Sequence, residues 1–214
     1  MTVPAQFVRS NTVLTASSLV PEIRLHLATE ILPLWNKTED EIEKNGLPPP
    51  YWAFAWPGGQ ALARHILDHP DYVRGRRVLD IGAGSGLVAV AAAMAGAARS
   101  EAAEIDPFSL AAIAMNAEEN GAAVEILGDD VIGTASRWDA LLVGDMCYER
   151  PLAERLTTWL EACAQAGALV LLGDPGRAYL PRTGLKEVAR YRVPTSLDLE
   201  DRVERETIVW RLGL

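Results

Sequence analysis

The chain has 214 residues, of which 49% are hydrophobic and 23% are charged, and its formal net charge at pH 7 is −9. This length is typical of one globular domain, and we expect residues 1–214 to form one. The acidic excess disfavours general binding to nucleic acid, whose phosphates attract Lys and Arg, and it weakly favours a basic or lysine-bearing partner.

The first part of the chain has a helical pattern. It covers residues 1–45 and is clearest from Pro21 to Leu34, where Pro21 is a typical helix start. The charged stretch 38–44 follows, and we expect it to be exposed. The sequence therefore predicts a helix over 21–34.

An aromatic segment follows the helical one. Residues 47–50 contain three consecutive prolines, which cannot continue a helix because they lack backbone N–H groups. Four aromatic residues then lie within 51–56, and Pro-Gly-Gly at 57–59 ends the segment. A helix is expected at 60–67.

From residue 76 the chain alternates between predicted strands and helices. Strands are predicted at 76–81, 100–104, 123–127, 139–144 and 167–173, and helices at 86–95, 107–119 and 151–165. This rhythm favours a parallel sheet that is covered on both faces. Two late strands, 185–193 and 205–212, predict an antiparallel pair at one edge of the sheet.

A glycine-rich loop follows the first strand of this core. The apolar run ends at Asp80, and Gly82, Gly84 and Gly86 follow at alternate positions. Glycine permits a sharp turn and close approach of a ligand, and the helix behind the loop offers free N–H groups. A dinucleotide-binding loop would place its third glycine where Leu87 stands, and no P-loop pattern is present. The loop therefore predicts a site for some other nucleotide-like cofactor.

Acidic residues at the ends of the next two strands suit further contacts with such a ligand. Glu104 lies about 20 residues after the loop, where a carboxylate accepts hydrogen bonds from ribose hydroxyls. Asp106 either shares that role or caps the helix that opens at Pro107, and we favour the cap. At Asp129 and Asp130, one acid either accepts from an adenine amino group or caps a turn, and both interpretations stay open.

Other polar residues are interpreted as structural. Asn116 and Asn120 are expected at the surface and the end of their helix. Three histidines are expected on helices or their ends at the surface, rather than as catalytic bases: His26, His65 and His69. The sequence thus predicts no nucleophilic triad and no metal site.

These landmarks together resemble the class I, S-adenosylmethionine-dependent methyltransferases. The loop from Asp80 to Gly86, Glu104 and Asp129 match the family's three cofactor landmarks. Two further segments, Pro48 to Leu62 and Gly173 to Arg177, resemble hallmarks of the electron transfer flavoprotein beta-subunit lysine methyltransferases. Asp145 to Tyr148 matches the Asp-x-x-Tyr motif of the seven-strand protein lysine methyltransferases. Glu104 stands where many methyltransferases have Asp, and either acid can bind ribose.

The resemblance implies an α/β fold, a Rossmann-like sheet of seven strands that is mostly parallel with an antiparallel last strand and helices on both faces. It also implies S-adenosyl-L-methionine as cofactor, S-adenosyl-L-homocysteine as product and no metal. The N-terminal segment 1–70 is expected to cover substrate and cofactor, and 71–214 to form the core. The implied cofactor-binding residues are Trp56, Asp80, Gly82, Ala83, Gly84, Gly86, Glu104, Ile105, Asp129 and Gly144. Asp145 and Tyr148 are implied as catalytic, and Trp52 and Phe54 as substrate-binding.

Methyl transfer to lysine needs a neutral amine that lies opposite the leaving sulfur. Free lysine has a pKa of about 10.4, and burial among aromatic rings lowers it. The rings expected to form such a pocket are Trp52, Phe54, Trp56 and Tyr148. The alternative for the first three, and chiefly for Trp52 and Phe54, is that they pack the N-terminal segment against the core. Asp145 is expected to attract and orient the charged amine, which loses its proton to water before attack.

The predicted function is therefore an S-adenosylmethionine-dependent protein-lysine N-methyltransferase that acts on the electron transfer flavoprotein beta subunit. One alternative is methylation of a ribosomal protein or another protein target. A second is a non-catalytic cofactor-binding scaffold. An NAD-dependent oxidoreductase is disfavoured by Leu87 and by the Asp-x-x-Tyr motif.

The expected partner is the protein substrate, with neither nucleic acid nor membrane, and the chain is expected to act as a monomer. Cys147 and Cys163 form no Cys-x-x-Cys pair, which disfavours a disulfide framework. The chain opens without a basic segment followed by an apolar core, and its longest apolar stretch, 87–98, is too short to span a bilayer. A reducing, cytoplasmic location is therefore expected, and an organelle matrix is the alternative.

Overall fold

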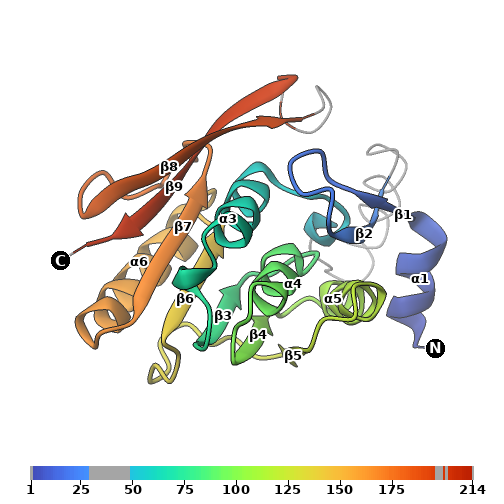
Figure 1. The fold of residues 1–214 in the computed structure, drawn as a ribbon, viewed down its shortest axis with the longest axis horizontal. Coiled ribbons are helices and arrows are strands. Elements are labelled where there is room, and N and C mark those ends of the chain that lie inside the picture. The colour runs from blue at the N-terminus through green and yellow to red at the C-terminus, as the bar shows by residue number, and fades with distance from the viewer. Residues whose placement is uncertain (1, 29–48, 196–199, 201, 214) are drawn as a thin grey trace.

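A seven-stranded sheet organises the structure, a computed structural model that describes residues 2–28, 49–195, 200 and 202–213. The strands are β3 (Arg77–Ile81), β4 (Arg99–Ala103), β5 (Val124–Leu127), β6 (Ala140–Gly144), β7 (Leu169–Asp174), β8 (Leu185–Pro194) and β9 (Glu204–Leu212). Along the sheet they lie in the order β5-β4-β3-β6-β7-β9-β8, as Figure 1 shows.

The strand directions confirm the predicted fold class. The strands from β5 to β7 pair in parallel, whereas β9 runs antiparallel to both β7 and β8. The last strand is thus the antiparallel one, and the late pair lies at the sheet edge as expected. The chain runs outward from β3 to β5 and then returns to β6 on the other side of β3. Such a reversal leaves a crevice at the carboxyl ends of the strands, where ligands bind.

Helices cover both faces of this sheet. On one face lie α3 (Pro57–Asp68), α4 (Leu87–Met94) and α5 (Pro107–Glu119), and on the other lies α6 (Arg150–Gln165), as Figure 1 shows. Successive residues of β3 alternate between two cores: Val78 packs with the α3 and α4 side chains, and Leu79 packs with those of α6. Because both faces are covered, β6 and β7 are apolar along nearly their whole length, and β3 is apolar except for Arg77 at its start and the buried Asp80.

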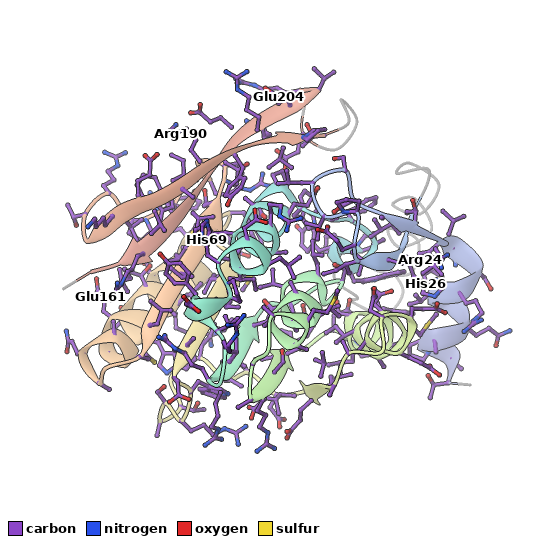
Figure 2. The ribbon with its side chains drawn as sticks, viewed as in Figure 1. Arg24, His26, His69, Glu161, Arg190 and Glu204 are labelled. Atoms are coloured by element: carbon purple, nitrogen blue, oxygen red, sulfur yellow. The ribbon has the colours of Figure 1, made fainter. Side chains whose placement is uncertain are left out.

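The N-terminal part contains α1 (Val3–Asn11), β1 (Val13–Ala16), β2 (Arg24–Leu27), and the 3-10 turns η1 (Tyr51–Ala53) and η2 (Pro70–Tyr72). The helix predicted over 21–34 is wrong where the structure describes it, because 24–27 form a strand that pairs with β1. Asn120, the C-cap of α5, accepts the N–H of Arg24 at 2.9 Å, and Asn116 within α5 accepts that of His26 at 2.7 Å, so tertiary contacts override the helical pattern. Figure 2 labels both residues on this strand. Residues 29–34 and 38–44 lie outside the described part.

Three polar residues expected at the surface lie in the interior instead. Asn116 has no exposed surface. Its Oδ1 accepts the N–H of His26 at 2.7 Å, and its Nδ2 donates to the carbonyl of Ser85 at 2.8 Å. His26 and His65 are also buried, whereas His69 is exposed. Asn116 therefore connects the N-terminal strand with the glycine-rich loop.

Within the described residues, every helix falls short of the length and apolar content that crossing a bilayer requires.

Candidate active site

A cavity of about 410 Å³ opens at the carboxyl ends of the parallel strands. Its walls come from Gly82 after β3, Glu104 after β4 and Gly144 at the end of β6. The volume lies within the roughly 300–1,000 Å³ of typical ligand pockets. The lining also includes Tyr51, Trp56, Ile105, Asp129, Asp145, Tyr148 and Arg177. The topological crevice of this sheet is therefore a ligand-sized site.

The loop between β3 and α4 turns on glycines with left-handed backbone. The φ angles are 60° at Gly82, 52° at Gly84 and 79° at Gly86, a region in which other residues are strained. Gly82 and Gly84 line the cavity. Gly86 lies behind it as the residue that precedes α4, and Ala83 packs in the apolar cluster between α4 and α5. The structure thus brings two of these four predicted residues to the cavity and places two behind it.

Glu104 joins the glycine-rich loop to the end of β4. Its Oε2 accepts the N–H of Gly84 at 3.1 Å, and its Oε1 accepts that of Ile105 at 2.8 Å. Burial raises the pKa of Glu104, and these backbone hydrogen bonds oppose the rise. The neighbouring Asp106 accepts the N–H of Phe108 at 3.0 Å, so the interpretation as the cap of α5 is confirmed. Both acids line the cavity, and because the Asp106 carboxylate caps α5, Glu104 is the better candidate of the two for a ligand hydroxyl.

Asp80 lies behind the loop, buried with 2% of its surface exposed. Its Oδ2 accepts the N–H of Ala89 at 2.9 Å, which ties the first turn of α4 to β3. Burial raises the pKa of Asp80 to about 8; the Ala89 N–H opposes this, and the charge of Glu104 adds to it. Asp80 therefore supports the glycine-rich loop and does not line the cavity.

The first turn of α3 lies so close to the ends of β6 and β7 that only glycine fits at position 58. A Cβ on Gly58 would lie 2.1 Å from the carbonyl oxygen of Gly173 and 2.5 Å from Oδ2 of Asp145. The N–H of Gly59 donates to the same Oδ2 at 3.0 Å. The Pro-Gly-Gly sequence thus directs the positive end of the α3 dipole toward Asp145.

Asp145 is held in an unusual conformation. Its φ is 56°, and in the part of the chain that the structure describes it alone among non-glycine residues has a positive φ. Its N–H donates to the carbonyl of Gly173 at 3.0 Å, which fixes this backbone. Backbone strain of this kind costs roughly 1–3 kcal/mol and concentrates at functional sites. Burial raises the pKa of Asp145 to about 6, the Arg177 guanidinium opposes the rise, and Asp174 adds to it.

Arg177 reaches into the cavity from the turn after β7. Its Nη2 and Nε donate to Oδ1 of Asp145 at 2.8 and 3.2 Å, and its Nη1 donates to Oε2 of Glu200 at 3.3 Å. The guanidinium carbon lies 5.6 Å from the ring centroid of Trp56. Asp174 shapes the turn by accepting the N–H groups of Gly176 and Arg177 at 2.7 and 2.6 Å. The turn formed by the Gly-Asp-Pro-Gly-Arg motif, residues 173–177, therefore places a guanidinium beside Asp145.

Three aromatic rings line the same end of the cavity. The indole N–H of Trp56 donates to the carbonyl of Tyr51 at 2.9 Å, and the two ring centroids are 5.8 Å apart. The ring of Tyr51 also lies 5.5 Å from that of Tyr148. Burial raises the pKa of Tyr148 to about 12, with Tyr51 and Glu149 adding to the rise, so this phenol stays neutral at pH 7.

Trp52 and Phe54 lie elsewhere than the sequence led us to expect. They are only 1% and 5% exposed, and they pack with side chains of α1 and α5. Trp52 stacks on Phe108 with centroids 6.4 Å apart, and Phe54 supports Trp56 from behind at 6.0 Å. Neither ring lines the cavity. The structure therefore corrects the substrate-binding assignment for both and agrees with the packing alternative; Tyr51 takes the place expected for them.

The two acids after β5 differ in their surroundings. Both line the cavity, but Asp130 pairs with Arg155 at 2.7 Å and accepts the N–H of Ile132 at 3.0 Å. Asp130 is thus the turn acid. This leaves Asp129 as the better candidate of the two for a ligand amino group.

Sequence reasoning missed several parts of the site. Arg177 carried a signal, because it ends a motif with a family resemblance, but its contact with Asp145 was not foreseen. The close approach of Gly58 to β7 had a weaker signal in the adjacent glycines. Glu200 had none, since it lies 23 residues from Arg177 and is isolated in the sequence.

Comparison with known proteins gives a consistent result. Residues 62–142 match the family model described as ribosomal protein L11 methyltransferase (PrmA). The electron transfer flavoprotein beta subunit lysine methyltransferase of Danio rerio is 40% identical, over 96% of this chain and 81% of that protein. Its counterpart in Rattus norvegicus is 38% identical, over 95% of this chain and 82% of that one.

Solved structures share the fold at low sequence identity. A ribosomal protein L11 methylase from Lactobacillus delbrueckii subsp. bulgaricus superposes with a TM-score of 0.56 at 18% identity, over 79% of this chain and 83% of that chain. A magnesium protoporphyrin IX methyltransferase from Synechocystis PCC 6803, crystallised with bound SAM, gives a TM-score of 0.53 at 17% identity, over 73% and 80%.

Proposed function

The chain belongs to the electron transfer flavoprotein beta subunit lysine methyltransferases, and on that premise we propose that it transfers a methyl group from S-adenosylmethionine to a lysine of that beta subunit. The relatives that carry this activity in their names match almost the whole chain. The motif resemblance drawn from the sequence is thereby confirmed at the level of the family, and the substrate is the proposal.

One observation carries the proposal at the level of the site. A single cavity joins a glycine loop and a fixed carboxylate, Glu104, to a second carboxylate, Asp145, which lies among aromatic rings. The first pair suits a nucleoside, and the second suits an amine. A methyl donor and a lysine both need to enter one space for the reacting atoms to meet.

The cofactor half of the cavity fits a nucleoside with a cationic side arm. Bound there, S-adenosylmethionine would supply an activated methyl group on a sulfonium. Glu104 would accept hydrogen bonds from the ribose, and Asp129 from the adenine amino group. Gly82 and Gly84 would form one wall of the ligand site, with Gly144 and Trp56 on the other side. We assign a supporting role behind the loop to Asp80, Ala83 and Gly86, and a place on the outer wall to Ile105.

The substrate half would receive the lysine. Asp145 would attract the ammonium and fix its direction, while the rings of Tyr51, Trp56 and Tyr148 hold its cationic head. A lysine in this half-buried position loses solvation of its charged form, which favours release of the proton to water. Asp145 and Tyr148 are the residues that we place beside the reacting nitrogen.

We further propose that residues 1–214 act as one domain and as a monomer in the cytoplasm, with neither nucleic acid nor membrane as partner. Tyr51 and Trp56 support a covering role for 1–70, since they form walls of a cavity in the core. The net charge of −9 opposes binding to phosphates. Cys147 and Cys163 are buried and unpaired, as a reducing compartment favours. Light scattering of the purified chain tests the monomer.

The test is a methylation assay on purified electron transfer flavoprotein with radiolabelled S-adenosylmethionine, followed by mass spectrometry of the beta subunit. We expect label on a lysine of that subunit, and labelling roughly 10²–10³-fold slower with Asp145→Asn. A second arm uses ribosomal protein L11, because the family model over 62–142 names that target. Label on L11 alone would transfer the proposal to ribosomal substrates. Calorimetric binding of the cofactor with no label on either protein would indicate the non-catalytic scaffold.

A further inference from the structure

The acid proposed to receive the substrate lysine already holds a cation. Oδ2 of Asp145 accepts the N–H of Gly59, and Oδ1 accepts two N–H groups of Arg177. The Asp145 side chain is 9% exposed and that of Arg177 is 19% exposed, so little water is available to replace either partner. A lysine ammonium that approaches Asp145 therefore meets a guanidinium at Oδ1.

The ionised groups around this contact have a net negative charge. Asp145, Asp174 and Glu200 face Arg177, and Arg205 pairs with Glu200 at 2.9 Å. With all three carboxylates ionised, these three carboxylates and two guanidiniums have a net charge of −1. A lysine ammonium entering the cavity would balance it.

Arg177 also pairs with a second carboxylate, that of Glu200. Its guanidinium already donates to both carboxylate oxygens of Glu200, whose side chain is 1% exposed. The ring of Trp56 lies under the guanidinium and holds it by cation–π attraction while its carboxylate partner changes.

We propose that Arg177 is a positioning residue that keeps Asp145 ionised and aimed until the lysine arrives, and that it then releases Asp145 and keeps its bonds to Glu200 as the ammonium takes its place. The inference rests on the proposed function for the identity of the incoming cation. A buried carboxylate left without a counter-charge is costly, and an exchange of one cation for another avoids that state.

The ionisation of Asp145 is the property that Arg177 would control. Arg177 is the main group that opposes the effect of burial on this carboxyl, and Asp174 acts in the other direction. The other titratable groups nearby are Cys147 and Tyr148 on the following turn, with Glu149 and Tyr51 beside the tyrosine. Burial raises the pKa values of Cys147 and Tyr148 to about 12, so neither titrates near neutral pH.

The test compares Arg177→Gln and Arg177→Lys with the matched control Arg190→Gln. Arg190 is an exposed, ion-paired arginine on β8, labelled in Figure 2 on the outer strand of the sheet. The first measurement needs no substrate: the carboxyl carbon of Asp145 is titrated by ¹³C NMR in the full chain and assigned with Asp145→Asn. We expect the midpoint to rise by roughly 1 to 3 pH units in Arg177→Gln. It should rise less in Arg177→Lys and stay unchanged in Arg190→Gln.

The second measurement is kcat/KM for the beta subunit as a function of pH. Relative to wild type, Arg177→Gln should lose roughly tenfold at pH 7, where Asp145 would be mostly protonated, and regain most of that loss at pH 9. A loss that is equal at every pH, or an unchanged Asp145 midpoint, overturns the inference. A wild-type protein inactive on the beta subunit overturns the proposed substrate instead, and the NMR titration still decides the role of Arg177.

Discussion

The two ends of the cavity are built in different ways. At the cofactor end, left-handed backbone occurs at glycines, where it costs little, and the fixed acid Glu104 bonds to Gly84, 20 residues earlier. At the substrate end, left-handed backbone occurs at Asp145, and its partners Gly59 and Arg177 lie 86 and 32 residues away. One end is a local turn, and the other is an assembly of distant segments.

Backbone strain and buried charge are thus concentrated at the substrate end of the cavity. A cofactor that is shared by many methyltransferases needs a pocket of backbone shape. A lysine needs a carboxylate that is dry, ionised and correctly aimed, and this requires a strained residue with charged partners around it. We therefore expect substitutions at the substrate end to reduce turnover and those at the cofactor end to reduce affinity for the methyl donor.

The largest effect should follow from Asp145→Asn. Asparagine tolerates positive φ and can accept the Gly59 N–H, so it removes the charge with little change in the backbone. We expect kcat to fall by roughly 10²–10³-fold, as for other groups that act on charge in a reaction centre. Cofactor affinity, measured by calorimetry, should be nearly unchanged. Turnover close to wild type would exclude a role for this carboxylate in catalysis.

The next largest effect should distinguish alanine substitutions at two adjacent glycines of α3, Gly58 and Gly59. A Cβ on Gly58 would collide with the Gly173 carbonyl and Asp145, whereas the nearest atom to a Cβ on Gly59 is a methyl of Val88 at 3.9 Å. Gly58→Ala should destabilise the protein by roughly 1–3 kcal/mol, as other overpacked substitutions do, and lower kcat by moving Asp145. Gly59→Ala should be neutral or stabilise the helix by about 0.5–1 kcal/mol. Chemical denaturation measures both, and equal effects would contradict the close approach.

A smaller effect is expected at the cofactor end. Glu104→Gln keeps an acceptor for the N–H of Gly84 or Ile105 but loses the negative charge toward the ribose. The dissociation constant for S-adenosylmethionine should rise about tenfold, because a hydrogen bond to a charged group contributes about 1.4 kcal/mol more than a poor replacement. At saturating cofactor, kcat should be nearly that of wild type. A drop in kcat with unchanged affinity would mean that the two ends are not separate.

Sequence reasoning succeeded where structure is local. The strands and helices from residue 76 onward were predicted within two residues of their observed ends, because turn residues and apolar runs mark them in the chain itself. The glycine loop and Glu104 belong to this class. The helix predicted over 21–34 failed because asparagines in α5 and at its C-cap, 90 and 96 residues away, bind the backbone of β2.

The substrate end was predictable only in part, for the same reason. The Asp-x-x-Tyr motif pointed to Asp145 and Tyr148, but nothing in the sequence near Asp145 indicated that Arg177 and Glu200 would meet there. Trp52 and Tyr51 are neighbours with similar chemistry, and which of them faces the cavity depends on how η1 sits against α1 and α5. A pattern shows which residues can make a pocket, and packing decides which of them do.

The smallest effect lies at the far end of α3, whose first turn meets Asp145. His65 is 3% exposed and its Nδ1 lies 3.1 Å from the hydroxyl of Tyr191 on β8. Burial lowers the pKa of His65 from 6.5 to about 4, and the charge of His69 adds to this. Since the folded state resists protonation here, His65 supports stability above pH 6.5, and this support is lost as the pH falls toward 4.

His65→Gln removes that titration while leaving an amide to bond Tyr191. The unfolding free energy of wild type should fall by about 1 kcal/mol more than that of the variant over this acid range. The matched change is His69→Gln at the exposed end of the same helix, labelled in Figure 2, which should keep most of the wild-type acid sensitivity. Turnover of both variants at pH 7 should equal that of wild type, because Asp145 depends on the first turn of α3 and not on its last. A large loss of turnover in His65→Gln would show that the whole helix, rather than its glycine turn, sets the position of the acid.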